Sequence, residues 1–155
     1  MSRARDLASY IATGVMPTQP AFLLQGKTGT AISLTSAYQV ITNTHMDTTF
    51  DQASDVASGV FTAPFTGKYV FSAYCYHYSS TSGNSIHFSL LTSNNEYLVV
   101  GAARSGSTNG PGFLSVITDM DASDTAQIRV RNWDSSTGSV SISAGQLWFS
   151  GYLAV

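Results

Sequence analysis

Residues 59–72 read Gly-Val-Phe-Thr-Ala-Pro-Phe-Thr-Gly-Lys-Tyr-Val-Phe-Ser, and this stretch decides the fold class. Pro64 has no backbone N–H to donate to a strand ladder, so we predict that a strand over residues 56–63 ends there. Gly67 then closes a turn, and residues 67–78 form the longest strand candidate of the chain. A strand that stops at Ala-Pro, a turn closed by Gly and a long aromatic strand together predict an antiparallel corner.

Apolar residues recur with a period of two on both sides of this corner, in short segments separated by Gly, Asn, Asp and Ser. We expect the other strands at residues 22–24, 38–42, a short piece from Phe50, 86–91, 97–102, 113–118, 126–132, 140–143 and 146–155. Residues 101–112, rich in Gly and Ser, are expected to form an exposed loop. About ten short strands predict an all-β fold, an antiparallel jelly-roll sandwich. No G-x-G-x-x-G motif follows a strand, which argues against a parallel nucleotide-binding sheet.

The composition excludes several classes of partner. Charged residues make up 10% of the 155 residues, the net charge is −2, and no run of Lys or Arg occurs. We therefore expect no nucleic-acid partner, because such proteins carry a basic patch. No segment approaches the ~18 apolar residues of a membrane span, so we expect no membrane contact. The single cysteine, Cys75, lies in an apolar strand, where we expect a small buried side chain and assembly in a reducing cytosol.

Residues 1–19 follow a different pattern. Ala4, Leu7, Ala8 and Ile11 recur at the spacing of a short amphipathic helix. About three turns are available, which is marginal for an isolated helix, so this segment needs a surface to lie on. We therefore divide the chain into an N-terminal docking arm, residues 1–19, and a β domain, residues 20–155.

Two strands are apolar on both faces. In residues 69–78 one face carries Tyr69 and Phe71, and the opposite face carries three more tyrosines. The last strand likewise places Trp148 and Tyr152 opposite its buried candidates. An antiparallel sheet with one solvated face alternates apolar with polar residues, so either other subunits or loops of the same chain must cover the second face. We predict a subunit interface formed by Phe22, Tyr74, Tyr76, Tyr78, Trp148 and Tyr152.

Several segments carry a resemblance to a known family. They are Pro20-Ala21-Phe22, Phe50-Asp51, Val60-Phe61-Thr62-Ala63-Pro64, Gly67-Lys68-Tyr69-Val70-Phe71 and Phe149-Ser150-Gly151-Tyr152-Leu153. Together they resemble the globular head of C1q/TNF-like proteins over about residues 20–155. The resemblance implies a small jelly roll that assembles as a homotrimer, with the terminal strand and the long central strand in the sheet that faces the threefold axis.

The segment Ser2-Arg3-Ala4-Arg5-Asp6-Leu7-Ala8 is similar to short leaders on tailed-phage virion proteins. This likeness implies a structural virion protein, a homotrimeric decoration or cement protein on a phage capsid, assembled in the host cytoplasm. Its partners would be its own copies and the major capsid protein. The residues expected to dock on the capsid are Arg3, Arg5, Leu7, Tyr10 and Ile11.

Two other functions stay open. The chain could be a trimeric receptor-binding or glycan-binding module of a phage tail fibre or spike, with a host surface glycan held by loops 79–85 and 103–112 and stacked on Tyr78. It could also be an exported C1q-like lectin, although no segment with the pattern of a secretory signal is found.

Motifs for chemistry are sparse. His45, His77 and His87 lack any metal-binding spacing, no G-x-S-x-G motif occurs, and we expect neither an enzyme nor a cofactor. Asp119, Asp121 and Asp124 form a D-x-D-x-x-D sequence that could hold calcium, although acidic residues that end a strand and shape a turn are commoner. Arg129 and Arg131 lie on one strand face, where we expect them to be solvated or paired with these acids in a neighbouring subunit.

Overall fold

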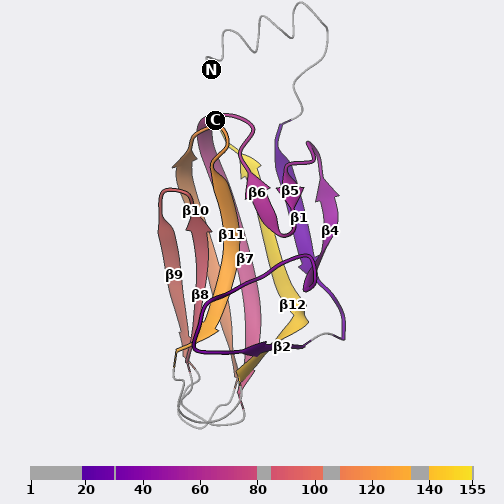
Figure 1. Ribbon diagram of the computed structural model, residues 1–155, viewed down its shortest axis with the longest axis vertical. Coiled ribbons are helices and arrows are strands. Elements are labelled where there is room, and N and C mark those ends of the chain that lie inside the picture. The colour runs from indigo at the N-terminus through magenta and orange to yellow at the C-terminus, as the bar shows by residue number, and fades with distance from the viewer. Residues whose placement is uncertain (1–18, 30, 80–84, 103–108, 134–139, 155) are drawn as a thin grey trace, which may run out of the picture.

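The computed structural model describes residues 19–29, 31–79, 85–102, 109–133 and 140–154, and shows two antiparallel sheets packed face to face (Figure 1). The strands are β1 (Ala21–Gly26), β2 (Ala31–Leu34), β3 (Gln39–Val40), β4 (Met46–Asp51), β5 (Val56–Ala57), β6 (Val60–Thr62), β7 (Gly67–Ser79), β8 (Ser85–Thr92), β9 (Glu96–Ala102), β10 (Asn109–Met120), β11 (Thr125–Asn132) and β12 (Val140–Leu153). No helix occurs within these described ranges. The prediction of an all-β antiparallel jelly-roll sandwich is confirmed.

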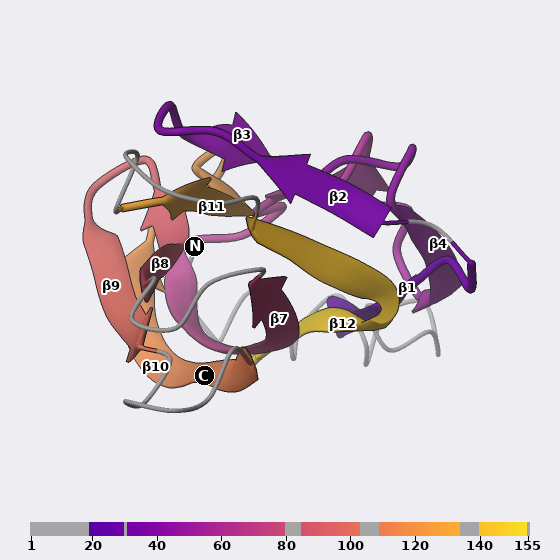
Figure 2. The same cartoon turned by 90° about the horizontal axis from the view of Figure 1, so that it is seen from below.

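Each sheet has six strands. Sheet A has the order β10-β7-β12-β1-β4, with β2 pairing the first part of β12. Sheet B has the order β5-β6-β11-β8-β9, with β3 pairing β11. Strands β9 and β10 are the edges of their sheets and lie side by side without a ladder between them, as Figure 2 shows.

The predicted corner connects the two sheets. Strand β6 in sheet B ends at Thr62, and the chain crosses to sheet A through Pro64 before β7 begins. The segment expected as one strand before this corner is instead a hairpin, β5–β6, because Ser58 and Gly59 both have positive φ (53° and 80°). Two such residues form the tight turn that joins antiparallel strands. A Cβ on Gly59 would lie 2.6 Å from the carbonyl oxygen of Ile41, so only glycine fits there.

Aromatic rings fill the space between the sheets. Phe22 stacks on Phe61 with ring centres 5.1 Å apart and meets Phe149 edge-on at 5.0 Å. Phe71 packs against the same rings, and a Cβ on Gly151 would lie 2.5 Å from it. The prediction that Phe22 belongs to a subunit interface is therefore wrong. Its side chain is 1% exposed because the inward face of β1 carries it into the core.

Other differences concern the bounds of strands. β4 is longer than the piece predicted from Phe50, because most of its residues are exposed and polar. β2 was also not expected; it has four residues, of which Ile32 and Leu34 are buried. β10 begins at Asn109, inside the predicted loop. Pro111 does not interrupt it, because β10 is an edge strand and proline, which lacks an N–H, is tolerated there. β12 is one strand, not two, and its register with β7 shifts between Ile142 and Leu147.

The two ends of the sandwich differ. The described chain begins beside the end of β12, where the backbone N–H of Leu153 donates to the carbonyl of Pro20 at 3.0 Å. At the other end β7, β9 and β11 stop and β8, β10 and β12 begin (Figure 1). The expected helix and almost the whole docking arm, residues 1–18, lie outside the described residues.

Candidate functional site

The outer face of sheet A is lined with apolar rings across three neighbouring strands. Register places Phe113 of β10, Tyr74 of β7 and Trp148 of β12 in one row. A second row, four residues along each strand, holds Ile117, Val70 and Tyr152. We call this surface the aromatic face; its members are Val70, Tyr74, Tyr76, Tyr78, Phe113, Ile117, Trp148 and Tyr152.

The rings of the aromatic face contact one another but stay open to solvent. Tyr74 stacks on Trp148 with ring centres 6.2 Å apart, and Phe113 meets Trp148 edge-on at 6.1 Å. Nevertheless Ile117 is 66% exposed, Phe113 55% and Tyr152 48%. No segment among the described residues covers them, although one face of the same strands is closed by the core.

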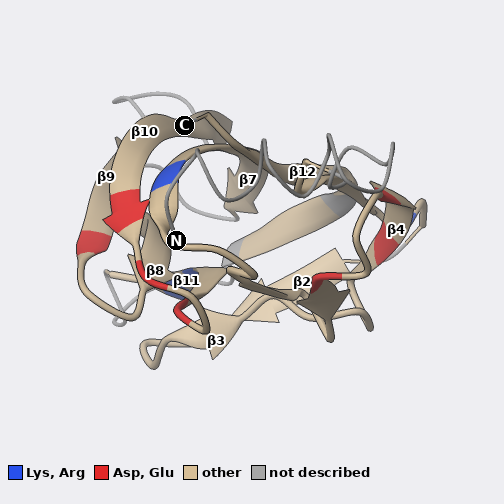
Figure 3. Ribbon diagram, turned by 90° about the horizontal axis from the view of Figure 1, so that it is seen from above, with Lys and Arg blue, Asp and Glu red and all other residues tan. Residues whose placement is uncertain are grey.

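Between the two apolar rows runs a row of serines. The hydroxyls of Ser72 and Ser115 are 2.9 Å apart, and Ser150 follows in register on β12. Of the described residues on this side of β7, β10 and β12, only Lys68 and Asp119 carry charge; Figure 3 colours the ribbon by charge. These two side chains pair with each other at 2.6 Å. The face is therefore apolar, with hydroxyls in the middle and an ion pair at one margin.

The predicted interface residues other than Phe22 are brought together here. Tyr74, Tyr76, Tyr78, Trp148 and Tyr152 share the face, and contact with another subunit stays a prediction. The sequence reasoning missed Phe113 and Ile117. The signal was present, because Phe113 and Ile117 alternate with the inward Leu114 on a strand that is again apolar on both faces.

A groove runs beside the aromatic face, along the seam between β9 and β10. It encloses about 560 Å³ and is lined by residues 96–99 and 113–116. Both strands are sheet edges here, so their outward backbone groups lack ladder partners. Leu98, 46% exposed, and Phe113 stand at this seam, which thus joins an apolar groove to the aromatic face.

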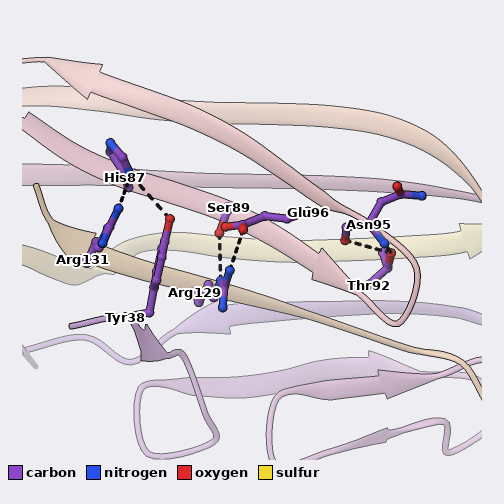
Figure 4. Close-up of polar contacts among 8 residues, drawn as sticks. All are labelled: Tyr38, His87, Ser89, Thr92, Asn95, Glu96, Arg129 and Arg131. Carbon is purple, nitrogen blue, oxygen red and sulfur yellow. Dashed lines mark hydrogen bonds and ion pairs between the residues drawn. The ribbon is translucent and has the colours of Figure 1, made fainter.

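The outer face of sheet B has a different surface. Arg129 of β11 donates to Glu96 of β9 at 2.6 Å and to the buried hydroxyl of Ser89 at 3.3 Å (Figure 4). The ring of Tyr38 lies 4.0 Å from the Arg129 guanidinium. Hydrogen bonding from Arg129 lowers the pKa of the Glu96 carboxyl. The expectation that Arg129 is solvated or pairs with acids of a neighbouring subunit is therefore wrong, since its partner is Glu96 of its own chain.

Arg131 belongs to a second cluster two residues along the strand. Its guanidinium lies 4.4 Å from the ring centre of Tyr38 and 4.6 Å from that of Trp133. Its Nη2 donates to Nδ1 of His87 at 3.2 Å (Figure 4), and His87 stacks flat on Trp133 at 4.2 Å. The guanidinium is thus packed between aromatic rings. The expectation that it is freely solvated is wrong.

The three acids considered for calcium have other partners. Asp119 pairs with Lys68, and Asp124 accepts hydrogen bonds from Asn94 and from the backbone N–H of Asp121. Asp121 accepts from Thr66. Throughout the described part of the chain no three His, Cys, Asp or Glu side chains gather as metal ligands would. The acids shape the turn between β10 and β11.

Cys75 and His77 point into the core from β7. Both are fully buried, as expected for the cysteine, and burial raises the pKa of the Cys75 thiol to about 12. Neither ring nitrogen of His77 has a hydrogen-bond partner, and burial lowers the pKa of its imidazole.

Tyr78, on the outward side, donates to Gln146 at 2.7 Å. Most of loops 79–85 and 103–112 lies outside the described residues, so their predicted role in glycan binding stays untested.

Comparison with solved structures identifies the fold. The chain is similar to the globular domain of zebrafish complement 1qA protein (TM-score 0.58, 17% identity, 88% of this chain and 98% of that one). It is also similar to Eiger TNF from S. frugiperda (TM-score 0.60, 15% identity, 90% and 94%) and to murine APRIL (TM-score 0.56, 9% identity, 87% and 98%). No family model matches the sequence, and no curated protein matches it.

Identities this low establish the fold alone. The β domain has the jelly-roll fold of C1q and TNF globular domains, as its sequence resemblance implied. The likeness of residues 2–8 to phage leaders lies outside the described residues and stays a prediction. Among the residues described, no helix is of a length and hydrophobicity to span a membrane.

Proposed function

We propose that this chain is a structural assembly protein that works as a homotrimer closed through the aromatic face. The observation that carries the proposal is the pair of apolar rows on sheet A, with Phe113, Ile117 and Tyr152 about half exposed or more. Full burial of an aromatic or branched side chain stabilises by roughly 1.5–3 kcal/mol. Burial of both rows therefore favours association, and a contiguous patch of this kind marks an association site.

The placement of the two apolar surfaces supports a ring. The aromatic face lies on the broad side of sheet A, whereas the β9–β10 groove lies at its edge. A contact between one subunit's edge and the next subunit's face is heterologous, and such contacts close into rings when the rotation allows. In such a ring each subunit would offer its edge to one neighbour and its face to the other. The two contacts would meet at Phe113, which belongs to both surfaces.

We further propose that the trimer decorates a phage capsid and cements it. A trimer matches the threefold and quasi-threefold points of an icosahedral shell. The arm joins the sandwich at Gln19, at the end opposite to the three loop-bearing strand pairs. Three arms could therefore reach the major capsid protein through Arg3, Arg5, Leu7, Tyr10 and Ile11 while the loops point outward from the virion surface. Linkage makes the second and third arm contacts effectively intramolecular, so each can be weak.

Binding to shells tests the capsid role. Purified protein is mixed with undecorated capsids and the bound fraction is measured by sedimentation, with a variant lacking residues 1–16 in parallel. We expect the full chain to bind and to raise the temperature at which the shells open, and the shortened chain to stay trimeric but unbound. Equal binding by the shortened chain would contradict the docking role of the arm.

A second candidate is a receptor-binding module of a tail fibre or spike. It is favoured by Tyr78, which is 38% exposed and packs edge-on against Tyr76 at the loop-bearing end. An exposed tyrosine ring of this kind suits stacking against a host surface glycan. The same protein mixed with host cells distinguishes the two functions, because a cement protein binds shells and not cells, whereas a fibre tip does the reverse.

A further inference from the structure

A break in β12 divides sheet A into two parts. The register of β12 with β7 shifts between Ile142 and Leu147, so residues 143–146 of β12 all lie opposite Tyr76 of β7. The neighbours of β12 change at the same point, because the segment before the break pairs β2 and the segment after it pairs β1. A bulge of this kind interrupts the ladder. We call the smaller part the strand tip; it consists of residues 31–34 of β2, 77–79 of β7, 109–111 of β10 and 140–143 of β12.

The edge strand β10 holds the strand tip only weakly. It pairs the end of β7 through the sequence Asn109-Gly110-Pro111-Gly112. Glycine weakens a strand because it loses more conformational freedom on folding, and proline has no N–H to donate to the ladder. Figure 2 looks onto this end of the sandwich, where β12 lies between β7 and β2. The strand tip is therefore joined to the rest of sheet A by an interrupted ladder on one side and a glycine-proline segment on the other.

His77 lies in the middle of the strand tip. Register places it in one row with Gly110 of β10, Ile142 of β12 and Ile32 of β2, and all of these residues are buried. The described residues give neither nitrogen of its ring a hydrogen-bond partner. Burial lowers the pKa of this imidazole, and the backbone of Gly110 offsets the effect only in part. The folded tip therefore favours the neutral form of His77.

The groups that face His77 do not compensate a proton on its ring. The next inward residue of β7 is Cys75, and burial raises the pKa of this thiol to about 12, so it stays neutral. The residues of β10, β12 and β2 in the same row are glycine and isoleucine. Sheet B presents Ile86 of β8 and Asn132 of β11 to the core at this end, and neither is charged. A charge buried without a partner is costly, so protonation disfavours the closed tip.

We propose that the strand tip is an acid-triggered element: the uptake of one proton by His77 releases the tip from the sandwich while the larger part of sheet A stays folded. Opening lets the imidazolium reach water, and local opening needs less free energy than unfolding of the domain. The tip carries Tyr78, the residue considered for glycan stacking, so its release changes the surface at the loop-bearing end. This response is distinct from the proposed assembly role, because both apolar rows of the aromatic face lie outside the tip.

Hydrogen exchange measures the opening of the strand tip directly. The full chain is labelled at pH 7.5 and at pH 5.0, and each peptide is compared with the same peptide of the unfolded chain, which removes the intrinsic effect of pH on exchange. We expect exchange in residues 77–79, 109–111 and 140–143 to rise by up to about tenfold for each pH unit below 6.5, the limit for the uptake of one proton. Residues 67–72 and 116–120, in the larger part of sheet A, should stay protected.

Cys75 gives a second readout of the same opening. It is the one cysteine of the chain, it is fully buried, and it is the inward residue next to His77 on β7. The probe is 4,4′-dithiodipyridine, and its rate of reaction with Cys75 is divided by its rate with a cysteine peptide at the same pH. We expect this ratio to rise on acidification together with exchange in the strand tip.

Variants assign the response to His77. His77→Leu removes the titrating group from an apolar row, so it should fold, and its strand tip should not respond to pH in either assay. His77→Gln, which takes up no proton in this range, serves the same purpose if the leucine variant fails to fold. His45→Gln is the matched control, because the pKa of His45 is lowered too but this residue lies in a turn outside the tip. It should keep the full acid response.

Three results would overturn the proposal. The first is unchanged exchange in the strand tip at pH 5.0. The second is exchange that rises equally in residues 116–120, since this indicates unfolding of the whole domain. The third is an undiminished acid response in His77→Leu and His77→Gln. None of these results bears on the subunit number, which sedimentation measures separately at pH 7.5.

Discussion

The outer faces of the two sheets differ in how they meet water. Sheet B covers part of its outer face with its own chain: Tyr38 lies over the guanidinium of Arg129, which pairs with Glu96. Leu98 and Val100 at its β9 edge stay about half exposed. Sheet A presents rings such as Tyr152 and Phe113 with no covering segment among the described residues. The strands below are alike in one respect, since both sheets send apolar side chains into the shared core.

This difference indicates where the chain needs a partner. A polar cluster loses little when it stays in water, whereas apolar area left in water forgoes roughly 25 cal/mol for each Å² that could be buried. The polar cluster of Tyr38, Glu96 and Arg129 on sheet B is therefore stable in one subunit. Covering the aromatic face is favourable, and no charged side chain of the described residues lies around Trp148 to oppose burial.

The largest effect should come from a charge placed on the aromatic face. Tyr152→Asp puts an acid among the apolar rows, and its burial in each of three interfaces costs several kcal/mol. We expect the trimer to dissociate, with an affinity lower by at least about a hundredfold. Sedimentation velocity measures this.

Trp133→Asp is the matched control. Trp133 is 52% exposed and Tyr152 is 48% exposed, but the former lies on sheet B. The control should remain trimeric. If both variants assemble equally well, or if only Trp133→Asp dissociates, the assignment of the interface to sheet A is contradicted.

The next effect concerns the inward side of the same strand. Gly151→Ala brings a Cβ to 2.5 Å from Phe71 and 2.8 Å from Phe22, both rings being fixed in the core. Overpacking of this kind destabilises by about 3 kcal/mol. Chemical denaturation measures the loss.

Gly145→Ala serves as its control on β12, since the nearest atom to its Cβ is 3.8 Å away. We expect the control to change the free energy of unfolding by less than about 0.5 kcal/mol. Equal effects of the two substitutions would mean that the close approach of β12 to the phenylalanines is absent.

A smaller effect is expected on the outer face of sheet B. Glu96→Gln replaces the charged acceptor of Arg129 with a neutral amide, in a pair whose side chains are 33% and 21% exposed, and should destabilise by about 1 kcal/mol. Asp119→Asn removes the partner of Lys68, where exposure is 80% and 54%, and should have almost no effect. Thermal unfolding compares the two variants. A larger loss of stability in Asp119→Asn than in Glu96→Gln would contradict the stabilising role of the pair of Arg129 and Glu96.

The pH dependence of the Glu96 contribution has a defined sign. The pKa of this carboxyl is lowered in the folded chain from its ordinary value of 4.5. The unfolded chain therefore binds the proton first, and the stabilisation is present above pH 4.5 and is lost as the pH falls through the folded pKa. Glu96→Gln should flatten this part of the stability curve.

His77 should give the mildest slope, at higher pH. Its pKa is lowered from 6.5 by burial, so the unfolded chain is protonated more readily and stability decreases as the pH falls below 6.5. The decrease is at most about 1.4 kcal/mol for each pH unit. His77→Leu should remove most of it, whereas His45→Gln should remove less, because His45 is only partly buried although its pKa is lowered too. An unchanged slope in His77→Leu would contradict the unpartnered burial of this imidazole.

Alternation in the sequence predicted much of this arrangement. The pattern of β7 and β12 identified two strands with apolar residues on both faces, and it assigned Tyr74, Trp148 and Tyr152 to the correct side. Phe22 was assigned wrongly because the face of a short strand depends on its register. Its partner in β12 is Gly151, whose missing side chain makes room for the ring inside the core.

The cluster on sheet B could not be predicted in the same way. Tyr38, Glu96 and Arg129 are far apart in the sequence and meet only because β8 pairs both β9 and β11 while β3 pairs β11. No local spacing encodes that neighbourhood. The polar strand β4 was underestimated for a related reason, since a sheet-edge strand with an exposed surface lacks the apolar signal on which strand prediction rests.

The subunit mass at high dilution tests the central claim most directly. Sedimentation equilibrium of the full chain from micromolar to nanomolar concentration should give three times 16.5 kDa, about 50 kDa, with Tyr152→Asp near the single mass. A soluble, folded species of 16.5 kDa at micromolar concentration would contradict the claim that the aromatic face is covered by sister subunits.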